Sequence, residues 1–313
     1  GSLDPLVFGQ ESGPAGLPNT KLAVRDGRGL IETDYGPVGV AVNGEGLLSH
    51  GWRGQLAAAA PSLAFPGCAA GRVSAFGDVR TTSGEPAFSG PLRLASLVCE
   101  ETGISLADYA VDLDLLGNDE LTDATIEARI EGGDSILAAN SAAALTGTIR
   151  AQTRGPLTTA RFSLAARGVE TPQALAAVLT AEGQIRADDD FSRVQLDGNL
   201  EGNGLRLGRE MVGSVETLAR AGEGTFIAPL TRKLARALQS ETRGSALDAD
   251  IRLRRDAKGY SVLAPRAELR GGSGARLVSL SRLEIAVEEG KAPRIAGNIA
   301  TGGANMPRIT GRM

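Results

Sequence analysis

Apolar and polar side chains alternate with a period of two along most of this chain, and that alternation constrains the fold more than any other feature. Between residues 107 and 208 the pattern is almost uninterrupted, and in residues 109–115 every second side chain is large and apolar. A two-residue period places apolar side chains on one side of a β-strand and polar ones on the other. Turns rich in glycine, asparagine and aspartate, such as 117–119 and 132–134, separate the segments. The chain is therefore predicted to be mostly β, a long antiparallel sheet with one apolar side.

A helical element interrupts the strands. The sequence predicts a β meander over residues 3–208, helices within 209–243, and a continuing meander over 244–313. A shorter helix is expected at Thr171–Thr180, where Pro172 precedes a run of alanines and leucines. The second helix of 209–243 has a basic side opposite its apolar side. That arrangement suits either a surface for a membrane or protein partner or a helix packed over the sheet, and we favour the packed helix.

The ends of the chain indicate a fragment. Gly1 and Ser2 have the form of a tag remnant left by a protease, and the repeating pattern starts and stops without a polar tail. No apolar run in the sequence reaches the roughly 18 residues of a membrane span. We therefore expect a segment excised from a longer protein, with any membrane anchor outside it.

The charge and the cysteine content limit the possible binding partners and the cellular compartment of the protein. The net charge is -4 and basic residues are interspersed with acidic ones, so nucleic acid is not an expected partner. Cys68 and Cys99 are the only cysteines. One disulfide in an oxidising compartment is favoured over two buried free thiols.

No constellation of catalytic or metal-binding residues stands out. His50 is the only histidine, which excludes a site with several histidine ligands within one chain, and an enzyme built around it is the weakest interpretation. Asp188–Asp190 lack the glycine and distal glutamate of a calcium loop and are interpreted as a hairpin turn. Asp112 and Asp114 lie on the polar side of a strand, where alternating carboxylates are typical of a solvated surface. We expect no enzyme activity, no cofactor and no metal site.

The apolar side of the sheet is the remaining candidate for a functional surface. A sheet curled around an uncovered apolar side would form a groove, and an acyl chain gains about 0.8 kcal/mol for each CH₂ buried in such a groove. A second sheet packed over the same side would instead give a closed sandwich core. The predicted groove-lining residues are Val111, Leu113, Ile126, Ile130, Phe162, Leu164, Val194, Leu196, Leu200, Ile251, Leu253, Leu283 and Ile285.

Two regions of the sequence resemble a known family. The first contains residues 16–22 (GLPNTKL), 30–33 (LIET) and 35–40 (YGPVGV), and the second is the helical segment 224–230 (GTFIAPL) with its continuation through Leu238. Both are similar to the alphaproteobacterial YdbH-type members of the AsmA-like group, which includes AsmA, TamB and YhdP.

The resemblance implies a curled β-groove in the periplasm that moves phospholipid toward the outer membrane. It implies phospholipid as the ligand, an inner-membrane anchor missing from this chain, and an outer-membrane partner, and it supplies no catalytic residues. A periplasmic location agrees with one disulfide between Cys68 and Cys99. The alternative is a structural or adhesive β protein of the cell surface, such as part of an autotransporter passenger, with a sealed apolar interior.

Overall fold

The computed structural model describes residues 17–83, 85–118, 122–288, 290–303 and 308–312. In this part of the chain the backbone forms 18 strands and two helices, and the strands pair antiparallel, so the predicted mostly β fold is confirmed. The helices are α2 (Arg209–Arg220) and α3 (Ala228–Glu241), within the predicted helical element. Two compact units divide the chain, Gly1–Gly132 with Thr148–Leu157 and Gly133–Gly147 with Thr158–Met313.

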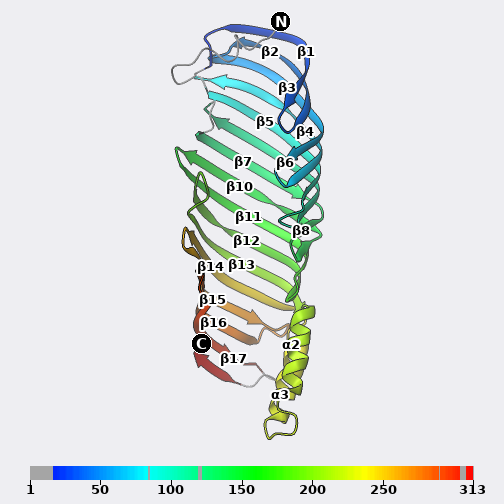
Figure 1. Cartoon of the computed structure of the whole chain (residues 1–313), viewed down its shortest axis with the longest axis vertical. Helices are drawn as coiled ribbons and strands as arrows, with labels where there is room; N and C mark the ends of the chain where they lie inside the picture. The colour runs from blue at the N-terminus through cyan, green and yellow to red at the C-terminus, as the bar shows by residue number, and fades with distance from the viewer. Residues whose placement is uncertain (1–16, 84, 119–121, 289, 304–307, 313) are drawn as a thin grey trace. The chain divides into compact units, whose positions relative to one another are not determined.

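The first unit is a meander in which each strand from β1 to β7 pairs antiparallel with the next (Figure 1). The strand β10 pairs with β7, and its residues from Thr148 onward belong to this unit. The bounds are β1 (Lys21–Thr33), β2 (Gly36–Leu47), β3 (His50–Phe65), β4 (Cys68–Thr82), β5 (Glu85–Cys99), β6 (Ile104–Gly117), β7 (Asp123–Gly132) and β10 (Ala144–Arg154). Long strands joined by short turns make a single-layer sheet.

Four residues inside neighbouring strands form a line across the first unit. Pro61, Arg72, Ala95 and Asp108 lie opposite one another in β3 to β6, each flanked by ladder pairs on both sides but absent from the ladder itself. Pro61 has no backbone N–H to donate. Arg72 and Asp108 have φ angles of 47° and 55°, in the left-handed region that costs a non-glycine residue about 1–2 kcal/mol. The regular strand conformation is therefore interrupted at the same level in four strands.

The apolar alternation changes phase at this line. In β5 the apolar residues occupy even-numbered positions before the line (Leu92 and Leu94) and an odd-numbered position after it (Leu97). In β4 the change falls between Ala70 and Val73. A residue outside the extended conformation interrupts the alternation of side-chain directions and bends the strand, as at a β-bulge. We infer that the line bends the sheet while the apolar side chains continue on one side of it.

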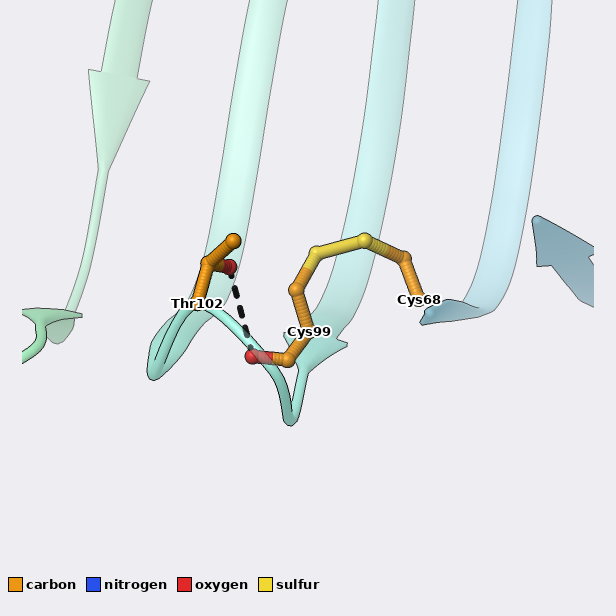
Figure 2. Close-up of a disulfide and its surroundings, with 3 residues drawn as sticks. All are labelled: Cys68, Cys99 and Thr102. Carbon is orange, nitrogen blue, oxygen red and sulfur yellow. Dashed lines mark hydrogen bonds between the residues drawn. A yellow bond between two sulfur atoms is a disulfide. The ribbon is translucent and has the colours of Figure 1, made fainter. Parts of the chain in front are cut away.

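A disulfide joins two of these strands near their ends. Cys68 at the start of β4 and Cys99 at the end of β5 are ladder partners, and their Sγ atoms are bonded (Figure 2). The hydroxyl of Thr102 donates a hydrogen bond of 3.5 Å to the carbonyl of Cys99, within the turn that leads to β6. The covalent bond thus holds two neighbouring strands of this sheet together.

The second unit repeats the meander and contains both helices. Strands β12 to β18 each pair antiparallel with the next, and β9 pairs with both β8 and β11. The bounds are β8 (Ser135–Leu137), β9 (Asn140–Ala142), β11 (Leu157–Glu170), β12 (Ala174–Asp188), β13 (Val194–Leu207), β14 (Ser245–Asp256), β15 (Gly259–Arg270), β16 (Arg276–Glu288), β17 (Arg294–Thr301) and β18 (Ile309–Arg312). The helices are inserted between β13 and β14, which nevertheless pair with each other.

The helix α3 packs on the sheet of the second unit. Ala237 and Leu277 of β16 are buried together, and the half-buried residues packed against them include Leu238, Leu269 and Val278. This contact agrees with the packed helix expected from the sequence. Within the described residues, neither helix combines the length and apolar character needed to cross a membrane.

The short helix predicted at Thr171–Thr180 is wrong, because β12 occupies most of that segment and pairs with β13. A turn precedes the strand, in which the backbone N–H and the hydroxyl of Thr171 both donate to the carbonyl of Ala174. The side-chain amide of Gln173 donates to Glu210 of α2 at 2.9 Å. The helix preference of alanine and leucine amounts to tenths of a kcal/mol per residue, and the ladder with β13 outweighs it.

Removal of the disulfide should destabilise the first unit. The double substitution Cys68→Ala and Cys99→Ala is expected to lower the free energy of unfolding by about 3–4 kcal/mol, because the bond closes a loop with a sequence separation of 31. Urea unfolding followed by the fluorescence of Trp52, the only tryptophan, reports on this unit directly. Reduction of the wild-type protein should reproduce the shift and should not affect the variant. Equal midpoints for the oxidised protein and the variant would contradict this role.

Position 108 should accept glycine with little loss of stability, whereas a β-branched residue there should destabilise the protein. Asp108→Val is expected to lower the free energy of unfolding by about 1–2 kcal/mol, because a β-branched side chain fits the left-handed conformation poorly, whereas Asp108→Gly should be close to neutral. Asp112→Val is the matched control, since Asp112 is also exposed in β6 but its φ is not positive. Urea unfolding followed by Trp52 fluorescence compares the three. A loss for Asp112→Val as large as that for Asp108→Val would show that strain is not the cause.

Candidate functional site

Backbone pairing assembles the apolar side chains of the first unit into continuous rows. Residues directly opposite each other in an antiparallel ladder place their side chains on the same side of the sheet, so successive ladder partners trace a row across it. One row crosses β1 to β7 and consists of Gly29, Val40, Ala58, Ala75, Leu92, Val111 and Ile130. A second row crosses the same strands through Val24, Gly44, Gly54, Val79, Phe88, Leu115 and Ile126. The first unit therefore has an apolar surface that is unbroken across seven strands.

The other side of the same strands is polar. A row of ladder partners there runs through Asn43, Gln55, Asp78, Ser89, Asp114 and Glu127. The hydroxyl of Ser89 donates a hydrogen bond to the carboxylate of Asp114. Water solvates one side of this sheet, and the apolar rows form the other.

The second unit has an equivalent apolar row across β12 to β17. Its ladder partners are Ile185, Leu196, Leu253, Val262, Ile285 and Ile295. On the same side the ring of Phe162 lies over Gly183, where an added Cβ would come within 3.0 Å of the ring. Gly183 and its ladder partner Gly198 leave room for that ring. Small and large side chains therefore complement each other along this surface.

The predicted lining residues all lie in strands and are all half-buried. Val111 and Ile130 are ladder partners in the first unit. Leu196 and Leu253 are ladder partners in the second, in the row that also contains Ile285. The remaining members occupy the same side as these residues within their own units, namely Leu113 and Ile126 in the first and Phe162, Leu164, Val194, Leu200, Ile251 and Leu283 in the second.

Several row members were not predicted from the sequence. They include Val40, Ala58, Ala75 and Leu92 in the first unit, and Ile185, Val262 and Ile295 in the second. The period-two signal was present in these strands, but alanine and glycine at alternate positions contribute little apolar contrast. Their membership becomes evident only when the register of each ladder is known.

The apolar rows are mostly half-buried in the part of the chain that the structure describes. The buried apolar side chains there are chiefly alanines, and the larger ones include Trp52, Leu205, Val215 and Leu277, none of which belongs to the predicted lining. Leaving apolar surface in water costs about 25 cal/mol per Å². A contiguous half-exposed apolar surface is typical of a binding site for an apolar ligand.

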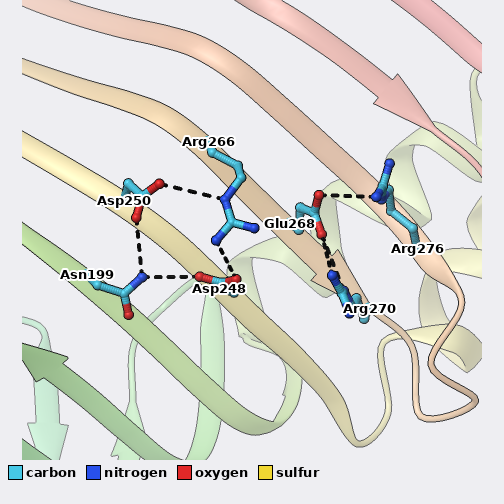
Figure 3. A network of polar contacts seen from close by, with 7 residues as sticks. All are labelled: Asn199, Asp248, Asp250, Arg266, Glu268, Arg270 and Arg276. Carbon is cyan, nitrogen blue, oxygen red and sulfur yellow. Dashed lines mark hydrogen bonds and ion pairs between the residues drawn. The ribbon is translucent and has the colours of Figure 1, made fainter.

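A polar network fixes the register on the opposite side of the second unit (Figure 3). The guanidinium of Arg266 lies 2.7 Å from Asp248 and 3.6 Å from Asp250. The amide of Asn199 donates to the same two carboxylates at 3.1 and 3.4 Å. The two carboxylates raise the pKa of Arg266, with Asp248 the larger cause.

Glu268 is held between two arginines in the same region. Its side chain is 10% exposed and lies 2.8 Å from Arg270 and 3.3 Å from Arg276. The hydrogen bond from Arg270, with the charge of Arg276, holds the pKa of Glu268 below its usual range. Because Glu268 and Asp248 are ladder partners, and like charges in that position are destabilising, the arginines offset a repulsion built into the sheet.

The polar candidates from the sequence lie in turns and on the solvated side. The Nδ1 atom of His50 accepts a hydrogen bond of 3.1 Å from the backbone N–H of Ser83. Asp188 pairs with Arg193 at 2.7 Å across the turn between β12 and β13, and hydrogen bonds from Ser192 lower the pKa of Asp190 in that turn. Over the described part of the chain, no three or more histidine, cysteine, aspartate or glutamate side chains are grouped to hold a metal ion.

Comparison with known proteins finds a family match over most of the chain. A family model described as "YdbH-like: Intermembrane phospholipid transport protein YdbH" matches residues 9–313. No curated protein and no solved structure matches the chain.

The ion pairs of Glu268 predict a specific dependence of stability on pH. The folded-state pKa of this carboxyl is lowered, so its contribution is present above the unfolded pKa of about 4.3 and is lost as the pH falls through the folded value. Glu268→Gln should therefore melt below the wild type at pH 7, and the difference should vanish in acid. Melting followed by circular dichroism measures this difference. Glu284→Gln, at an exposed position of β16, should change the melting temperature little at either pH, and a Glu268→Gln difference that persists unchanged in acid would contradict the assignment.

Proposed function

Because the chain belongs to the YdbH-like family of intermembrane phospholipid transport proteins, we propose that its apolar rows carry the acyl chains of phospholipids. The lipid head groups remain in water at the margin of the sheet. Transfer is passive: a lipid moves along the surface by exchanging one set of aliphatic contacts for another.

The continuity of the rows is the observation that supports this proposal. Neighbouring strands lie about 4.8 Å apart, so seven strands span roughly 29 Å, which is longer than an extended acyl chain. Along that distance the row through Val111 contains only aliphatic side chains and glycine. Sliding from strand to strand therefore exposes no CH₂ group to a polar side chain, and each buried CH₂ retains about 0.8 kcal/mol.

The bend in the first unit provides the curvature that a groove needs. A flat sheet would cover only one side of an acyl chain, whereas a sheet bent at the line from Pro61 to Asp108 faces it from two sides. The phase change at this line keeps apolar residues such as Leu94 and Leu97 on the concave side. Burial of the chain is thereby increased without a second layer.

We further propose that the protein works in the periplasm as part of a bridge between two membranes. The disulfide between Cys68 and Cys99 suits an oxidising compartment. An inner-membrane anchor and an outer-membrane partner would lie outside the residues described.

A sealed structural β protein is the second candidate. It would bury the same rows under another layer, as in a sandwich, and would carry no lipid. The half-exposed state of Val111, Leu113 and Leu196 favours the open groove over this alternative.

A charged residue in a row should abolish lipid binding without unfolding the sheet. The protein purified from a bacterial periplasm is expected to carry phospholipid, detected by native mass spectrometry and organic extraction. Leu113→Asp, Leu164→Asp and Leu196→Asp should each reduce the lipid content at least about tenfold, because a carboxylate in an apolar site carries a large desolvation cost.

The matched control is Gln195→Asp, which places the same charge on the solvated side of β13 next to Leu196. It should leave the lipid content unchanged, and circular dichroism should show folded sheet in all four variants. A lipid-free wild-type protein, or equal losses in Gln195→Asp and Leu196→Asp, would overturn the proposal.

A further inference from the structure

The connection between α2 and α3 exposes large apolar side chains that the sheet does not use. Phe226 is 95% exposed, Leu230 51% and Ile227 39%. Leu230 belongs to α3, which buries Ala237 and packs Leu234 against the sheet nearer its C-terminal end. In Figure 1 the turn joining the helices lies at the far end of the helical hairpin, away from the strands of its unit. Intramolecular packing therefore accounts for one side of α3 and, within the described residues, leaves Phe226 and Leu230 at its start largely exposed.

A basic stripe follows these apolar residues along α3. Arg232, Lys233 and Arg236 line a hollow of about 490 Å³ together with Pro229 and Ser240. Within the described residues none of the three cations forms an ion pair, although Arg232 donates a hydrogen bond to the carbonyl of Ala228 at 3.2 Å. Elsewhere in the same unit, the arginines of the Figure 3 network are paired with carboxylates, whereas Arg254 and Arg255 form no ion pair within the described residues.

The positions of Arg232, Lys233 and Arg236 do not stabilise α3 through the helix dipole. The first turn of α3 contains no acidic residue and its last turn contains no basic one, so the three cations lie outside the last turn, where positive charge favours the helix dipole. Residues 209–243 contain six basic and four acidic side chains, a net charge of +2 in a chain whose net charge is -4. Positive charge is thus concentrated where no carboxylate of the described residues pairs with the three cations, which indicates a negatively charged partner.

We propose that the start of α3 docks on the surface of an anionic phospholipid membrane. Phe226 and Leu230 enter the interface between head groups and acyl chains, and Arg232, Lys233 and Arg236 contact the lipid phosphates. An exposed aromatic residue next to a row of cations matches the two attractions that hold an interfacial helix, apolar burial and charge. This docking surface shares no residue with the apolar rows, so it can be tested independently of the lipid path proposed above.

Vesicle flotation tests the docking surface with the full chain. The protein should float with vesicles of phosphatidylethanolamine and phosphatidylglycerol, and much less with vesicles of phosphatidylcholine alone. The triple variant Arg232→Gln, Lys233→Gln, Arg236→Gln should bind at least about tenfold more weakly, and binding of the wild type should fall as salt is raised. Phe226→Ser with Leu230→Ser should weaken binding even at low salt.

Matched controls separate docking from general charge and from folding. The triple variant Arg254→Gln, Arg255→Gln, Lys258→Gln removes the same charge from exposed positions around the end of β14, and Phe76→Ser removes another exposed phenylalanine; both should float like the wild type. Leu113→Asp should lose bound lipid but still float. A wild-type protein that stays with the soluble fraction, equal effects of the two triple variants, or loss of flotation when inorganic phosphate is added at constant ionic strength would overturn the proposal.

Discussion

The backbone hydrogen-bonded ladder is the interaction on which the rest of this structure depends. Each strand has a two-residue period, and the ladder fixes which residue lies opposite which. A slip of one residue in a single pairing would move the apolar side chains of that strand to the solvated side and break every row that crosses it. The rows through Val111 and Leu196 exist because successive registers agree from strand to strand. Function, in this account, is a property of the register more than of any single residue.

A single-layer sheet needs other means of stabilisation than a closed core. In the first unit these are the disulfide between Cys68 and Cys99 and the long ladders. In the second, the arginines around Glu268 offset like charges in adjacent strands, and α3 covers one end of the sheet. Within the described residues these contacts leave the predicted lining half-buried, which is the condition that the proposed lipid path requires.

Local patterns predicted the strands, the turns and the helical element, because side-chain alternation and turn residues are properties of short segments. They also identified which side chains of a strand share a side. The alignment of Pro61 with Asp108, and the inclusion of Ala58 or Ala75 in a row, depend on pairing between distant segments and have no local signal. The wrong helix at Thr171–Thr180 has the same origin, since alanine and leucine favour a helix locally but pairing with β13 decides the outcome.

The most direct test of the lipid path is site-specific photocrosslinking in living cells with labelled phospholipid. A photoreactive phenylalanine derivative at Val111 or Leu196, in the apolar rows, should crosslink to phospholipid. The same group at Asp112 or Gln195, one residue away on the solvated side, should not. Crosslinks of equal yield on both sides, or none at the apolar positions, would contradict the account.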